Sequence, residues 1–425
     1  MSRSAPRFGE ALRVWLKVGC LGFGGPAGQI ALLHKAVVEE KGWIDEARFA
    51  HALSFCMLLP GPEAQQLAVW LGWRLHGVRG GIAAGLLFVL PGLLVMLGLS
   101  ALYMAHGRSE WAGPVLMGLK AAVVALVAQA VIRMGGRTIR DRAALVVAIL
   151  AFVALTFTRL PFPLLILVAG ATGWLLGNGR VGEAGEPEPR RGLWKTVALW
   201  LVIWLAPVGV ALLIAPQSVI ARMGLVFSGL AVVSFGGAYA ALAYLGQMAS
   251  SLGWLTPGQM LDGLGLAETT PGPLVLVFTF VGFVGAYQAA TPQWAWVAGV
   301  AGGLMAAWTT FAPSFLWIFA GGPFFERLRA RPRPARALAM VSAAAVGVIG
   351  QLAAWFATHY LFRTGETFSS GVFQVTVPDM SSLDQTALGL TVLALALTFA
   401  LRLPVLALVA AMVAAGLALR VVGLT

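Results

Sequence analysis

Charged residues are scarce in this chain of 425 residues: 11% are Asp, Glu, Lys or Arg, whereas 59% are hydrophobic. A water-soluble protein of this length carries far more polar surface. A membrane-spanning helix needs about 20 apolar residues, and apolar stretches of this kind run almost from end to end, with no soluble domain between them. The sequence therefore predicts an all-α polytopic membrane protein whose constant partner is the lipid bilayer.

Cysteine and histidine are also rare. Cys20 and Cys56 lie within apolar stretches, and the five histidines are scattered, so neither residue type has the spacing of a metal site or a disulfide framework. The sequence G-x-x-x-x-G-K-[ST] does not occur, so a primary pump would need a separate ATP-hydrolysing subunit. We expect no catalytic residue, no metal and no cofactor. The segment Met1–Phe8 lacks the apolar core of a signal peptide, so we expect no processing.

Acidic residues are fewer than basic ones, which gives a net charge of +12. In a soluble protein this excess would suggest a nucleic-acid partner. In a membrane chain Lys and Arg gather in cytoplasmic loops instead, and their placement here fits that explanation. We expect no nucleic-acid partner.

The clearest positive feature is an internal repeat. The motif Phe-Gly-Gly at 23–25 recurs at 235–237, 212 residues later, and Pro-Gly-Pro at 60–62 recurs at 271–273, 211 residues later. Gly80-Gly81 and Pro91 recur 222 residues later as Gly302-Gly303 and Pro313. Several anchors in one order with nearly fixed offsets indicate two homologous halves.

These anchors divide the chain into an N-terminal transporter repeat (1–178) and a C-terminal repeat (216–425). Between them we expect a solvated linker (179–193), because that stretch is rich in Gly, Pro, Glu and Arg. An additional transmembrane helix (194–215) has no counterpart at the start of the first half. One extra crossing would make the second half enter the membrane from the opposite face.

The distribution of arginine supports this inversion. Arg74 and Arg79 precede the Gly80-Gly81 helix, whereas the matching helix of the second half is followed by five arginines between 327 and 336. By the positive-inside rule, the halves have opposite orientations, as in many secondary transporters. This orientation places the N-terminus in the cytoplasm and the C-terminus on the opposite side of the membrane. A homodimer is left open.

Each half contains two interruptions of its apolar stretches by Gly and Pro. Such breaks leave backbone groups that lipid cannot satisfy, and a helix that begins after a break directs free amides and its positive dipole end at the break. A kink or close helix packing is the simpler alternative. Because the breaks recur at matching positions, we predict a mid-membrane anion site there. The residues at the breaks are Gly24, Gly25, Pro60, Gly61, Pro62, Gly236, Gly237, Pro271, Gly272 and Pro273.

Polar residues near the breaks complete the predicted site. Lys120 lies in an apolar run, where it either faces the substrate or neutralises Glu63 or Glu268. The two carboxylates either cap helices or bind a proton that couples transport. Hydrogen bonds to a tetrahedral oxyanion are expected from Gln65, Gln66, Thr269 and Thr270.

At these motifs the sequence resembles the chromate ion transporter family in its long, two-domain form. The resemblance rests on Phe23-Gly24-Gly25-Pro26, on 58–77 around the first Pro-Gly-Pro, and on 262–274 around the second, and it covers most of the chain. It implies an inner-membrane secondary transporter that exports chromate and gives chromate resistance, with sulfate as the structural analogue of the substrate. The resemblance also implies the bacterial inner membrane, so the C-terminus is expected in the periplasm. Our own hypothesis for the mechanism is alternating access around a site at the interface of the two repeats.

Three alternatives stay open at this point. The first is a transporter for another anion such as sulfate, and the second is an anion channel. An intramembrane enzyme acting on a lipid phosphate is the distant third, because such an enzyme needs a clustered acid/base or metal-binding set, and the sequence offers only isolated carboxylates.

Overall fold

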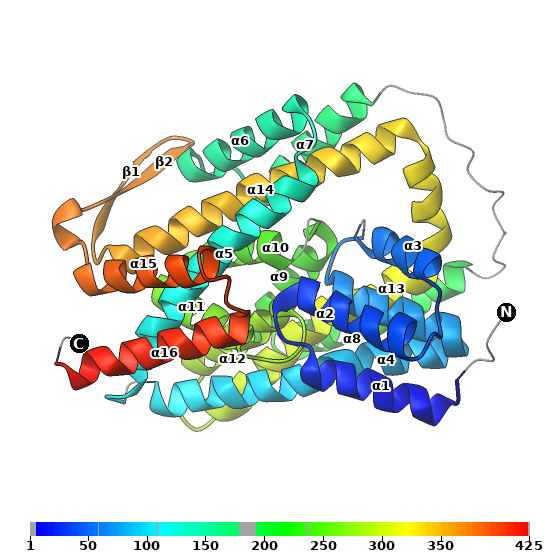
Figure 1. Cartoon of the computed structure of the whole chain (residues 1–425), viewed down its shortest axis with the longest axis horizontal. Coiled ribbons are helices and arrows are strands. Elements are labelled where there is room, and N and C mark those ends of the chain that lie inside the picture. The colour runs from blue at the N-terminus through cyan, green and yellow to red at the C-terminus, as the bar shows by residue number, and fades with distance from the viewer. Residues whose placement is uncertain (1–5, 58, 108, 178–192, 236–237, 424–425) are drawn as a thin grey trace. The chain divides into compact units, whose positions relative to one another are not determined.

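Helices form almost all of the protein. The computed structural model describes residues 6–57, 59–107, 109–177, 193–235 and 238–423 (Figure 1). The first half contains α1 (Phe8–Leu21), α2 (Gly25–His34), a π-helical turn η1 (Lys35–Glu40), α3 (Glu46–Cys56), α4 (Glu63–His106), α5 (Ala112–Thr138), α6 (Arg142–Phe157) and α7 (Phe162–Leu176). Helix α8 (Leu193–Ile214) follows. The second half contains α9 (Val219–Val233), α10 (Ala238–Ser251), α11 (Pro257–Glu268), η2 (Leu274–Leu276), α12 (Val277–Ala289), α13 (Ala295–Ala330), α14 (Pro332–Leu361), strands β1 (Gly365–Ser370) and β2 (Phe373–Pro378), η3 (Met380–Ser382), α15 (Gln385–Phe399) and α16 (Val405–Val421).

Five helices among the described residues are long and apolar enough to cross a bilayer: α4, α5, α8, α13 up to Gly321, and α14. Helix α4 is in fact two helices, because His76 and Gly77 have non-helical backbone angles. Six further apolar helices have 10–17 residues. The predicted all-α polytopic membrane fold is confirmed, since the described residues are mostly helical and five of the described helices are long and apolar enough to cross a bilayer.

A small β-hairpin was not predicted. Strands β1 and β2 pair antiparallel between α14 and α15, with Gly365 opposite Pro378 and Ser370 opposite Phe373. Gly371 has a φ of 57° at the turn, a left-handed conformation that glycine adopts without strain. The sequence signal was short and lay between two strongly apolar helices, so composition alone did not separate it from a loop.

The elements of the two halves correspond in order. Helices α1 and α9 each end at the first break, and α3 and α11 each end at the second break. The short helix from Glu63 to His76 corresponds to α12, and the long remainder of α4 corresponds to α13. In both halves the short helix crosses the long one closely at a glycine. A Cβ added to Gly72 would lie 2.4 Å from the Gly80 carbonyl oxygen, and one added to Gly282 would lie 2.4 Å from that of Gly302, so a larger residue would not fit at either crossing.

The chain divides into two compact units that do not coincide with the two halves. Unit 1 comprises 1–101, 182–238 and 270–330, and unit 2 comprises 102–181, 239–269 and 331–425. Each unit therefore takes elements from both halves. The repeat boundaries derived above describe sequence duplication, which stays a prediction, whereas the units describe packing.

Within unit 2, helices of one half pack against helices of the other. Helix α5 packs against α15 and α16, and α14 packs against α6 and α7. Two of the close approaches use equivalent glycines: a Cβ on Gly416 would lie 2.1 Å from the Pro114 carbonyl oxygen, and one on Gly173 would lie 2.5 Å from that of Arg336. Around the α5–α16 crossing the core is aliphatic, with Leu119, Ala122 and Met412 fully or almost fully buried.

Three predicted features lie wholly or largely outside the described residues. Gly236 and Gly237 are two of them, and the third is the linker 179–193, of which only Leu193 is described, as the first residue of α8.

Candidate functional site

The helix breaks occur where the sequence predicted them. Helix α1 ends at Leu21, and α2 begins at Gly25 after Gly24, whose φ is 85°. The second break of each half has a left-handed glycine at its centre, Gly61 with a φ of 111° and Gly272 with a φ of 101°. An L-residue in this conformation is strained, so these two positions require glycine.

The breaks of unit 1 are joined across the two halves. The amide of Gly61 donates to the carbonyl of Ser234 at 3.1 Å, and the amide of Gly272 donates to the carbonyl of Gly22 at 2.9 Å. Gly22 and Ser234 are equivalent positions, as are Gly61 and Gly272. The two hydrogen bonds are thus a pseudo-symmetric pair, each connecting the first break of one half with the second break of the other.

This pairing corrects part of the predicted anion site. The amides of Gly61 and Gly272 are bound to carbonyls and are not available to a substrate. The physical reason is that a buried amide without a partner costs about 1–3 kcal/mol, and the opposite break offers an acceptor. An anion at either break would have to use other donors.

Gln29 strengthens one of the two connections. Its side-chain amide donates to the carbonyl of Gly22 at 3.1 Å and also to the carbonyl of Gly272. Gln29 is completely buried. The equivalent residue of the second half is Ala241, so only the first half has a glutamine at this position. Sequence reasoning missed Gln29, although a glutamine four residues after Gly25 in an apolar stretch was a usable signal.

The first Pro-Gly-Pro break is lined by polar side chains. Gln66 donates to the carbonyl of Pro60 at 2.7 Å, and Gln65 donates to the carbonyl of Phe311 on α13 at 3.4 Å. Glu63 is the first residue of α4 and is half-buried. Pro60, Gly61, Pro62, Glu63 and Gln66 all belong to unit 1, and their role in binding a substrate stays a prediction.

Around the second break the predicted hydroxyl donors are used within the protein. Thr269 donates to the carbonyl of Leu266 at 2.7 Å, and the hydroxyl of Thr270 contacts the sulfur of Met96 at 3.8 Å. Thr269 caps the C-terminus of α11. Pro271, Gly272 and Pro273 lie in unit 1 with Thr270, whereas Thr269 belongs to unit 2.

Lys120 pairs with a residue that sequence reasoning did not select. Its ammonium lies 3.1 Å from a carboxylate oxygen of Asp262 on α11, and Tyr103 donates to the other oxygen of Asp262 at 3.0 Å. The expected partners were Glu63 or Glu268. Gly258 and Gly265 of α11 allow its close approach to α5, which places Asp262 beside Lys120. An intramembrane aspartate is itself a functional signal and could have been chosen.

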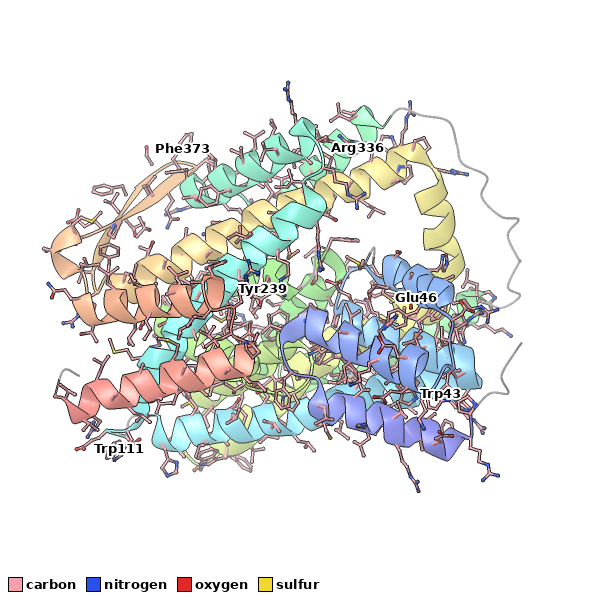
Figure 2. The ribbon with its side chains drawn as sticks, in the orientation of Figure 1. Trp43, Glu46, Trp111, Tyr239, Arg336 and Phe373 are labelled. Atoms are coloured by element: carbon pink, nitrogen blue, oxygen red, sulfur yellow. The ribbon has the colours of Figure 1, made fainter. Side chains whose placement is uncertain are left out.

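Glu268 lies at the end of α11, not at a helix N-terminus, so it does not cap a helix. Tyr239 on α10 donates to its carboxylate at 3.0 Å, and the charge of Arg133 on α5 acts on the same group (Figure 2 labels Tyr239). Glu268 and Asp262 are both buried in unit 2. Unit 2 thus holds two carboxylates of α11, each with a phenol donor and a nearby cation.

The family model for the chromate transporter matches the chain twice, over residues 9–174 and 221–417. The chain belongs to the chromate transporter family. The same family model thus matches a stretch in each half, and α8 lies between the two matched stretches.

Relatives of similar length support this membership. The chain is 35% identical to a chromate transport protein of Pseudomonas aeruginosa over 80% of this chain and 78% of the relative. It is 28% identical to a chromate transport protein of Cupriavidus metallidurans over 80% of each chain. An uncharacterized transporter of Methanocaldococcus jannaschii is 28% identical over 79% of this chain and 81% of its own. No solved structure matches the chain.

Proposed function

We propose that this chromate transporter family member exports chromate, or a closely related oxyanion, across the bacterial inner membrane by alternating access, and thereby gives chromate resistance. The observation that supports it best is the crossed pair of hydrogen bonds between helix breaks inside unit 1, in a chain similar to chromate transport proteins. Breaks of this kind are tolerated in a membrane only where they face protein, water or a ligand.

The energetics favour export. A membrane potential that is negative inside contributes about 2.3 kcal/mol per elementary charge per 100 mV, and it drives an anion outward without ATP. The two carboxylates of unit 2, Asp262 and Glu268, are candidates for a coupling proton, because each is buried beside a phenol and a cation.

The proposed inverted topology receives support from loop contacts in unit 2. Asp141 pairs with Arg336 at 2.6 Å, and both loops are cytoplasmic in the proposal. Arg159 donates to the carbonyl of Val372 in the hairpin at 2.9 Å, and Glu110 pairs with Arg420 at 2.7 Å, both on the periplasmic side in the proposal. Figure 2 labels Arg336 and Phe373 in the two regions concerned. Every pair joins loops or helix ends that the proposal assigns to one face.

The direct test is uptake of labelled chromate and sulfate into everted vesicles, with and without a proton gradient. We expect accumulation of chromate that depends on the chain and responds to the membrane potential. Absence of chain-dependent uptake of chromate would refute the proposed function, and a conductance without coupling would favour a channel.

The breaks are tested by Gly61→Ala and Gly272→Ala in the same vesicles. A Cβ at Gly61 would lie 3.1 Å from the Gln66 side-chain nitrogen, and one at Gly272 would lie 2.9 Å from the Leu276 side chain. Together with the left-handed φ, which costs about 1–2 kcal/mol, this should abolish transport while the protein still inserts. The matched control is Gly98→Ala on α4, where nothing lies within 4 Å; normal export by the Gly61 and Gly272 variants would exclude a role for the breaks.

A further inference from the structure

The two Pro-Gly-Pro breaks are equivalent in sequence but differ in their lining. Around the first break Gln65, Gln66 and Ser314 are 1%, 0% and 1% exposed. Their equivalents at the second break are Leu276, Val277 and Gly92. A Cβ on Gly92 would lie 2.0 Å from the carbonyl oxygen of Pro271 and 2.5 Å from Leu276, so Gly92 packs directly against the second break and leaves no room there for a side chain. At these three equivalent positions only the first break has polar side chains; the polar side chains at the second break, Gln29 and Thr270, bond to the carbonyl of Gly272 and the sulfur of Met96.

Some buried side-chain oxygens near the first break form no hydrogen bond with the residues that the structure describes. Within the described residues, the hydroxyl of Ser314 and the side-chain oxygens of Gln65 and Gln66 are buried and have no hydrogen-bond partner. A Cβ placed on Gly61 would lie 3.1 Å from the nitrogen of Gln66 and 3.8 Å from the hydroxyl of Ser314. Gly61 therefore lies beside both polar side chains, and a side chain at position 61 would crowd Gln66. Buried polar atoms without partners are rare and call for an explanation.

The scarcity of charged residues around the first break limits the charge of an anion that could bind there. None of the buried residues that the structure describes in unit 1 is charged, and α13 has no titratable residue over 295–321. The titratable residues closest to the break in the sequence are Cys56, at the end of α3, and Glu63, whose negative charge acts on Cys56. Because the cost of burying an ion rises with the square of its charge, a dianion beside Glu63 would be poorly stabilised.

We propose that the first break is the oxyanion subsite and that it binds the singly protonated monoanion, hydrogenchromate, in preference to a dianion. The carboxamide of Gln66 has one N–H left after its bond to Pro60 and an unpaired oxygen. It can donate to one oxygen of the ligand and accept from the ligand's hydroxyl, while Ser314 donates to a third oxygen. Chromate takes up a proton near neutral pH, whereas sulfate stays fully ionised, so this subsite also distinguishes the two.

This inference rests on the proposed function, and competition at one fixed pH tests it without titrating the protein. Uptake of labelled chromate into everted vesicles is measured with perchlorate or sulfate as competitor. Perchlorate is a tetrahedral monoanion without a hydroxyl, and sulfate is a dianion. We expect perchlorate to compete and sulfate to compete at least about tenfold more weakly, because the second negative charge of sulfate raises the cost of burying it. Equal competition by the two anions would overturn the inference.

Two variants locate the subsite. Ser314→Ala should raise the half-saturating chromate concentration and the perchlorate inhibition constant alike, because both ligands lose one donor. Gln66→Leu should raise the value for chromate about tenfold more than that for perchlorate, because only hydrogenchromate also loses an acceptor. The matched control is Gln351→Leu, a buried glutamine of α14 whose side-chain oxygen is also unpaired among the described residues.

An effect of Gln66→Leu no larger than that of Gln351→Leu would overturn the subsite, and so would an unchanged half-saturation in Ser314→Ala. If Gln66→Leu does not insert, the wild-type competition and Ser314→Ala decide the matter. Wild-type vesicles that take up chromate but fail the competition test refute this inference alone, whereas vesicles without chain-dependent uptake refute the proposed function.

Discussion

At the scale of single residues, the buried ion pair of Lys120 and Asp262 allows a sharp experiment. Removing one partner of a buried pair leaves an uncompensated charge and typically costs 3–5 kcal/mol, whereas replacing both with apolar residues is often neutral. We therefore expect Lys120→Met and Asp262→Leu each to lower the thermal stability of the purified protein, and the double variant to recover most of it. Half-saturation for chromate is measured on the same proteins.

The outcome separates two roles for Lys120. A double variant that is stable and has unchanged half-saturation would make the pair structural. A stable double variant with weakened chromate affinity would show that Lys120 also attracts the substrate. If the double variant is no more stable than the single ones, the pair measured at 3.1 Å does not determine stability.

A second experiment at this scale concerns pH. The hydrogen bond from Arg336, with the amide of Ala144, holds the pKa of Asp141 below its ordinary value of 3.8. A carboxylate with a lowered folded-state pKa stabilises the protein above the unfolded value, and this contribution is lost as the pH falls through the folded-state pKa. We expect Asp141→Asn to lower the melting temperature modestly at pH 7, and the difference from wild type to disappear as the pH falls through the folded-state pKa of Asp141.

The control is Glu366→Gln, which removes an exposed carboxylate from strand β1. A difference between Asp141→Asn and wild type that stays constant from pH 7 to acid pH would contradict the account. Melting curves in one detergent, recorded across this range, are sufficient.

At the scale of elements, the helix crossings depend on glycine. Gly118 of α5 lies against the carbonyl of Met412 on α16, where an added Cβ would approach the oxygen to 2.0 Å. Gly118→Val should separate the helices and destabilise the protein by roughly 1–3 kcal/mol, as overpacking does. The matched control on the same helix is Gly113→Val, where nothing lies within 4 Å; equal melting temperatures for both variants would show that the crossing tolerates a larger separation.

At the scale of the whole molecule, the proposed inversion places the β-hairpin and the 139–141 loop on opposite faces. After replacement of Cys20 and Cys56 by serine, single cysteines at Ser370 and at Arg140 should differ in labelling by a membrane-impermeant maleimide. We expect Ser370→Cys to react in intact spheroplasts and Arg140→Cys only in everted vesicles. Reaction of both from one side would refute the inverted topology.

The sequence predicted the elements well and the partners of its polar residues poorly. Apolar stretches, Gly/Pro breaks and the offsets of the repeat follow from composition and spacing, and the structure has helices ending at Leu21, Cys56 and Glu268 accordingly. Asp262 as the partner of Lys120 and Ser314 beside Gly61 depend on which helices lie together, 142 and 253 residues apart in the chain. Those distances are set by tertiary packing, and no local pattern encodes them.

The crossed hydrogen bonds at the breaks limit how this protein can move. Each of them ties a segment of one half to a segment of the other, and Gln29 reinforces one of the two ties. If one half rotated as a rigid body against the other, both of these hydrogen bonds would have to break. In the proposed transport cycle, each moving body would therefore contain elements of both predicted repeats.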